Sequence, residues 1–162
     1  MILYIYTVIH TLISLVAIFT GVVVLFGMIA GKRLDGWPKW FLTMAVLTTV
    51  TGFFFPFHGF TPAIGLGIIS LPFLAITIFA RYGWHLTGAW GWIYVIGAVI
   101  CLYFNLFVLV VQLFEKVPAL QAIAPTQTES PFKLVQLIVI VLTILLGIIA
   151  VVRFRPEPAC AV

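Results

Sequence analysis

Long apolar runs, separated by short segments of turn-forming or charged residues, make up most of the chain. A helix that crosses a membrane needs about 20 predominantly apolar residues. Five runs approach or exceed that length, at residues 2–30, 40–57, 62–80, 85–115 and 132–152. The pattern predicts an all-α fold, an integral membrane bundle of five transmembrane helices in a single domain, followed by a short tail at 153–162.

Composition leads to the same class of protein. Charged residues make up 7% of the 162 residues and hydrophobic residues 64%, whereas a soluble domain carries roughly 25% charged residues. A soluble fold of this composition would leave a large apolar surface in water. The lipid bilayer is therefore the expected partner, and the net charge of +4 does not indicate nucleic-acid binding.

The basic residues predict the orientation in the membrane. With five spans, two of the eight, Lys116 and Lys133, lie on one side, and the other six lie on the opposite side: Lys32, Arg33, Lys39, Arg81, Arg153 and Arg155. Because Lys and Arg favour cytoplasmic loops, the N-terminus is expected outside and the C-terminus inside. The connection HGFTP at 58–62 carries no charge, so the second and third segments have an alternative to two spans. They could form a re-entrant hairpin, provided that protein or water shields its backbone.

Polar residues form a seam along the fourth and fifth predicted helices. Tyr94, Asn105 and Gln112 share one helical stripe, and Gln136 and Thr143 share another. An unpaired amide in hydrocarbon costs roughly 4–8 kcal/mol, so these groups need partners. Equal distances from the intervening loop pair Gln112 with Gln136 and Asn105 with Thr143. The seam is expected either to join the two helices by hydrogen bonds or to line a path for a small ligand or ion.

Two histidines are predicted to lie at the same depth. His10 and His58 are about equally far from the turn near Asp35, so an antiparallel helix pair places them at one level. Two neutral imidazoles can bind a haem iron axially or bond a quinone. The alternative is that both are polar residues at helix ends. No third ligand accompanies them, so no zinc or copper site is predicted.

Several function classes have no support in the sequence. All four acidic residues lie in loops, at helix ends or in the tail, whereas proton-driven carriers normally bury one within the membrane. No catalytic residues are predicted, because the hydrolase, zinc-protease and nucleotide-binding motifs GxSxG, HExxH and GxxxxGK[ST] do not occur.

Three features together resemble small bacterial multi-pass membrane proteins of unknown function. They are a histidine in the first helix, TGF at 51–53, and RYGWHLTGAWGWIY at 81–94. The resemblance covers about residues 2–112. It implies a multi-pass topology in a bacterial inner membrane, and it brings no assigned activity.

The sequence therefore favours a non-enzymatic membrane protein. It is expected to be a homo-oligomer, a subunit of a larger membrane complex, or a binder of a small ligand. The alternative is a redox carrier that holds haem or quinone through His10 and His58. A third possibility is a channel or transporter.

Overall fold

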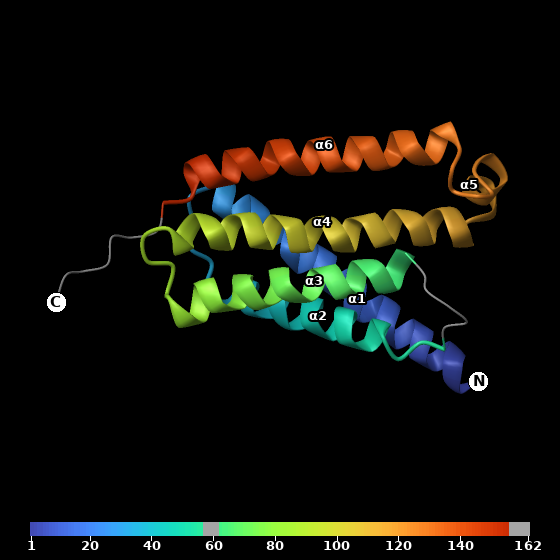
Figure 1. Cartoon of the computed structure of the whole chain (residues 1–162), viewed down its shortest axis with the longest axis horizontal. Helices are drawn as coiled ribbons and strands as arrows, with labels where there is room; N and C mark the ends of the chain where they lie inside the picture. The colour runs from blue at the N-terminus through green and yellow to red at the C-terminus, as the bar shows by residue number, and fades with distance from the viewer. Residues whose placement is uncertain (57–61, 156–162) are drawn as a thin grey trace.

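The computed structural model describes residues 1–56 and 62–155, and every regular element in them is a helix. The long helices run back and forth along one axis, and a short helix caps one end (Figure 1). This confirms the all-α prediction. In chain order the elements are α1 (Ile2–Ile29), α2 (Gly36–Gly52), α3 (Pro62–Ile78), the π-helical turn η1 (Phe79–Gly83), α4 (Trp90–Lys116), α5 (Pro118–Ile123) and α6 (Ser130–Arg153).

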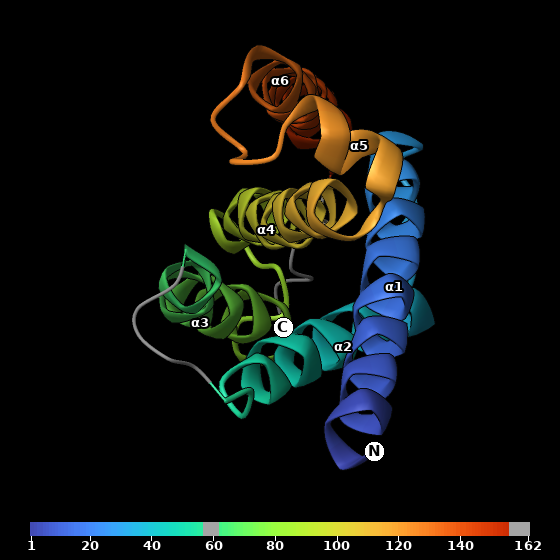
Figure 2. The same ribbon diagram turned by 90° about the vertical axis from the view of Figure 1, so that its right-hand side faces the viewer.

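Helix α4 is the centre of the bundle. It contacts α1, α3, α5 and α6, while α2 packs against α1 and α3 on the side away from α6 (Figure 2). The approach of α3 to α4 depends on a glycine, because a Cβ atom on Gly97 would clash with the hydroxyl oxygen of Thr77. Such close contacts are expected where lipid gives the helices no hydrophobic reason to associate.

Four helices are long and apolar enough to cross a membrane. They are α1, α3 with its extension through η1, α4 and α6. Helix α6 also exposes large aliphatic side chains along much of its outer surface, as a lipid-facing helix does. These features are those of an integral membrane protein. Helix α2 has 17 residues, about 26 Å at 1.5 Å per residue, which is slightly less than the roughly 30 Å of a hydrocarbon core.

Three predicted helix boundaries are wrong, and each has a local cause. Helix α2 begins at Gly36 rather than 40, since Pro38 lies in its first turn, where backbone N–H groups have no acceptor within the helix. It ends at Gly52 rather than 57, since Pro56 disfavours a helical residue before it. Helix α4 begins at Trp90 rather than 85, since His85 and the residue after it are left-handed, with φ of 48° and 61°.

The segment between α4 and α6, predicted as a polar loop, also contains the short helix α5. Glu129 precedes α6 and accepts hydrogen bonds from the hydroxyl of Thr126 and from the backbone N–H groups of Thr126 and Thr128. Burial acts to raise the pKa of the Glu129 carboxyl, but these hydrogen bonds outweigh it, and the pKa lies below its usual value. The ionised carboxylate therefore fixes the turn that precedes α6.

The charges of the described residues are distributed unequally between the two ends of the bundle. Lys116 and Lys133 lie at the end that holds α5. We call the opposite end the basic end, because six cations lie there: Lys32, Arg33, Lys39, Arg81, Arg153 and Arg155. The exposed side chains of Trp37, Trp40, Trp84 and Trp92 lie at the same end, as interfacial tryptophans do.

Candidate functional site

The connection between α3 and α4 buries an arginine. Arg81 lies in the π-helical turn η1, and its side chain is only 7% exposed. A π-helical turn adds one residue to the helical repeat, is rare, and occurs often at functional sites. A buried cation must be compensated by nearby polar groups. The groups around Arg81 therefore show which parts of the fold this turn connects.

Arg81 joins the α1–α2 loop to α4. Its Nη2 donates a hydrogen bond to the Leu34 carbonyl at 3.1 Å and lies 3.5 Å from the Asp35 carboxylate. The guanidinium carbon is 5.3 Å from the centre of the Tyr94 ring and 5.9 Å from that of Tyr82, within the range of cation–π attraction. Because the Asp35 side chain is 86% exposed, the ion pair is well screened, and the carbonyl and the rings are the principal partners.

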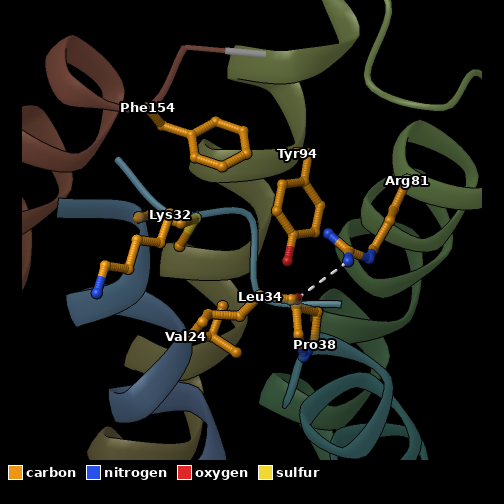
Figure 3. Close-up of a pocket in the computed structure, with 8 residues that line it drawn as sticks. Val24, Lys32, Leu34, Pro38, Arg81, Tyr94 and Phe154 are labelled. Atoms are coloured by element: carbon orange, nitrogen blue, oxygen red, sulfur yellow. Dashed lines mark hydrogen bonds between the residues drawn. The ribbon is translucent and has the colours of Figure 1, made fainter. Parts of the chain in front are cut away.

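A small cavity lies beside this cluster. It has a volume of about 10 Å³, and Arg81, Tyr94, Lys32 and Phe154 are among its lining residues (Figure 3). Tyr94 is 1% exposed, and its hydroxyl has no hydrogen-bond partner among the described residues. Since about 10–15 Å³ is the smallest space that holds a water molecule, the cavity has room for about one water that could bond the Tyr94 hydroxyl.

The end of α6 closes the same site. Phe154 is buried, and its ring lies 6.2 Å from that of Tyr94 (Figure 3). Gly31 (φ 68°) brings the α1–α2 loop against this segment, because a Cβ atom there would lie 3.5 Å from the Arg153 carbonyl oxygen. Four exposed cations therefore converge from two distant parts of the chain, and we call them the basic rim: Lys32, Arg33, Arg153 and Arg155.

The backbone that follows Arg81 is constrained as well. Leu86 has a left-handed φ of 61°, and its N–H donates to the Ala80 carbonyl at 3.1 Å. The rings of Trp84 and Trp90 stack with centres 5.5 Å apart and planes 5° from parallel. Unusual backbone conformations of this kind persist only where the surrounding contacts hold them. The segment 79–90 is therefore a fixed platform at the basic end.

The predicted polar seam lies between α4 and α6, but its hydrogen bonds differ from the expected side-chain pairs. Gln136 donates from Nε2 to the Phe107 carbonyl at 3.2 Å, which joins α6 to α4, and its Oε1 is buried without a partner among the described residues. Asn105 and Thr143 each bond a carbonyl four residues earlier in their own helix. Gln112 is half-buried. Backbone carbonyls therefore accept from the donor groups of Gln136, Asn105 and Thr143, in place of the expected side-chain partners.

His10 lies near the other end of the bundle. Its Nδ1 is 2.8 Å from the Thr51 hydroxyl, and its ring meets that of Phe55 edge-on at 5.1 Å. The Thr51 hydroxyl donates its proton to the Leu47 carbonyl at 2.6 Å, so Nδ1 of a neutral His10 must donate and Nε2 keeps its lone pair. His58, its predicted partner, lies outside the described residues. Within residues 1–56 and 62–155, no three His, Cys, Asp or Glu side chains gather as a metal site.

The sequence prediction did not identify the Arg81 cluster as a site. In the sequence, Arg81 is one of the six charges that predict the orientation, Tyr94 belongs to the polar seam, and both lie in the motif at 81–94. One signal in the sequence does point to the cluster. The segment RYGWH at 81–85 lies between two long apolar runs and places a cation, Arg81, beside two aromatic residues, Tyr82 and Trp84. Its partner Leu34 contributes only a carbonyl, however, and the sequence pattern gives no means of identifying a backbone partner.

Replacing Arg81 tests whether the cluster holds the basic end together. Arg81→Met removes the cation and leaves the Leu34 carbonyl without its donor, so we expect the free energy of unfolding to fall by about 1.5–3 kcal/mol, the value of a hydrogen bond to a charged group. Arg155→Met, at an exposed position, is the matched control. Reversible unfolding in mixed detergent micelles gives both values. Equal effects of the two substitutions would contradict the role given to Arg81.

Comparison with known proteins assigns no family to the chain. No protein-family model, no curated protein and no solved structure matches it. The resemblance described from the sequence therefore stays a prediction, and the geometry of the basic end and of His10 is the basis for assigning a function.

Proposed function

We propose that the chain is a non-enzymatic integral membrane protein with five spans, which binds an anionic, phosphate-bearing ligand at its basic end. The proposed setting is a bacterial inner membrane, with the basic end at the cytoplasmic face. The observation that carries the proposal is the convergence of the α1–α2 loop and the end of α6 into the basic rim, which the Gly31 contact with Arg153 brings about.

Charge complementarity identifies the ligand class. The described part of the basic end has one carboxylate, Asp35, which already lies 3.5 Å from Arg81 and 3.9 Å from Arg33. The other cations of the basic rim are exposed and have no carboxylate within ion-pair distance among the described residues. Arginine binds phosphate through two parallel hydrogen bonds, and each Lys or Arg near an anionic membrane surface contributes about 1 kcal/mol.

The orientation follows from the same charges. Six cations at the basic end against two at the other favour a cytoplasmic basic end, which places the N-terminus outside. In this orientation helix α2 also crosses the bilayer. It is slightly shorter than the hydrocarbon core, and local thinning of the bilayer accommodates the difference at modest cost. The exposed tryptophans of the basic end fit the inner interface.

A reporter fusion tests this topology. A fluorescent protein that folds only in the cytoplasm, fused after Val162, is expected to be bright, and alkaline phosphatase at the same position is expected to be inactive. A fusion after Gly52, between the second and third spans, should give the opposite pair of results. Phosphatase activity at Val162 would contradict the orientation, and fluorescence at Gly52 would contradict the five spans.

Neutralising the basic rim tests the ligand class. The protein is reconstituted into vesicles of phosphatidylcholine with increasing phosphatidylglycerol, and its thermal unfolding is followed. We expect phosphatidylglycerol to stabilise the wild type. Replacing all four residues of the basic rim by Gln should remove this effect, with each lost charge worth about 1 kcal/mol, or about fivefold in affinity. Lys116→Gln with Lys133→Gln, at the opposite end, is the control. If this control lost the effect equally, the basic rim would not be the site.

A second candidate function, a redox carrier, is favoured by the bond between His10 and Thr51. A histidine that binds a metal usually has its other ring nitrogen fixed by a hydrogen bond, and Thr51 fixes Nδ1 in this way. The free Nε2 lone pair suits a haem iron. It does not suit a quinone carbonyl, which needs a donor. His58 would be the second axial ligand, as expected from the sequence.

An absorption spectrum decides the redox candidate. Protein purified from cells supplied with a haem precursor should show a reducible Soret band if His10 ligates haem, and His10→Ala should abolish it. His85→Ala, at the basic end, should leave the band unchanged. A colourless wild-type protein, or a band that persists in His10→Ala, would exclude His10 as a ligand.

A further inference from the structure

An apolar groove of about 360 Å³ lies between α4 and α6 on the outer surface of the bundle. Its walls are entirely aliphatic apart from one glycine; Val99 and Ile100 contribute from α4, and Gly147, Ile148, Val151 and Val152 from α6. A Cβ atom on Gly147 would lie 3.0 Å from Val99, so the two helices approach each other closely there. An aliphatic groove on a lipid-facing surface suits a hydrocarbon chain.

The position of the groove along α6 links it to the basic rim. On α6 it extends from Ile144 to Val152, and Arg153 follows at once. This stretch rises about 12 Å, close to the roughly 15 Å of one leaflet in a hydrocarbon core of about 30 Å. The groove therefore covers most of one leaflet and ends where two cations of the basic rim, Arg153 and Arg155, begin.

We infer that the α4–α6 groove and the basic rim together form a binding site for one anionic phospholipid, with an acyl chain in the groove and the phosphate on Arg153 and Arg155. This inference rests on the proposed function and specifies its ligand. The groove requires that the ligand carry an acyl chain, which a soluble phosphate compound lacks.

Charge also argues against a second copy of the protein in the groove. Two copies inserted in the same orientation and packed through α6 would bring Arg153 and Arg155 of both chains to one level at the interface. Like charges close together oppose such a contact, whereas an anionic headgroup neutralises them. The phospholipid is the occupant that satisfies both the apolar walls and the cations.

Filling the groove tests the inference. Ile148→Trp places a large side chain in the groove at a position that is 57% exposed, so the bundle need not repack. Leu145→Trp, at a position 52% exposed that does not line the groove, is the matched control. Each protein is placed in phosphatidylcholine nanodiscs with a minor fraction of phosphatidylglycerol, and the lipids retained on release are identified by native mass spectrometry.

We expect the wild type and Leu145→Trp to retain phosphatidylglycerol in preference to phosphatidylcholine, and Ile148→Trp to lose about tenfold in this retention, as for loss of one central contact. Glycerol phosphate, the headgroup without chains, should not displace the lipid from the wild type. Val152→Trp, at a still more exposed groove position, replaces Ile148→Trp if that variant unfolds.

Three outcomes would overturn the inference. If Ile148→Trp retains phosphatidylglycerol like the wild type while the variant without the basic rim does not, the groove is not used and the proposed function stands. If neither variant loses retention, or the wild type shows no preference, the proposed function fails as well. If the wild type is released as a dimer that Ile148→Trp dissociates, a second copy occupies the groove.

Discussion

The burial of the Arg81 guanidinium is the constraint on which the rest of the basic end depends. A cation that is 7% exposed needs polar or aromatic partners close by. They come from the α1–α2 loop, through the Leu34 carbonyl, and from α4, through the ring of Tyr94. Phe154 then packs on Tyr94 and brings in the end of α6. One side chain thus fixes segments from nearly every long helix.

The fold separates structural and binding roles between its cations. Arg81 is enclosed, while the basic rim stays exposed, although both lie at the basic end. Asp35 lies close to Arg81 and Arg33, and among the described residues no carboxylate lies within ion-pair distance of Lys32, Arg153 or Arg155. The net positive potential that remains is directed at the surface, where a ligand can reach it.

Much of the architecture could be predicted from the sequence, because few backbone structures can cross a membrane. A lipid-exposed backbone must satisfy its own hydrogen bonds, so long apolar runs become helices. The unequal charges at the two ends could be predicted for the same reason, since helices that run back and forth bring Lys32 and Arg153 to one end. The predicted level of His10 and His58 stays a prediction, because His58 lies outside the described residues and His10 contacts Thr51 and Phe55.

The contacts that make the site could not be predicted in this way. The partners of Arg81 and Gln136 are the carbonyls of Leu34 and Phe107, and every residue has a carbonyl, so no residue type indicates them. Pairing side chains by equal distance from a loop failed for Asn105 and Thr143, because a carbonyl four residues earlier was nearer. The groove between α4 and α6 depends on how closely two helices approach, which aliphatic periodicity alone does not determine.

The contact between Gly31 and the Arg153 carbonyl has a consequence for biogenesis. The two halves of the basic rim are separated by well over half of the chain, so a ribosome finishes α1 and α2 long before it makes α6. Until α6 inserts, Phe154 cannot cover Tyr94, and the α1–α2 loop has no neighbour at Gly31. A partly synthesised chain therefore lacks the basic rim, and only a completely inserted chain presents it.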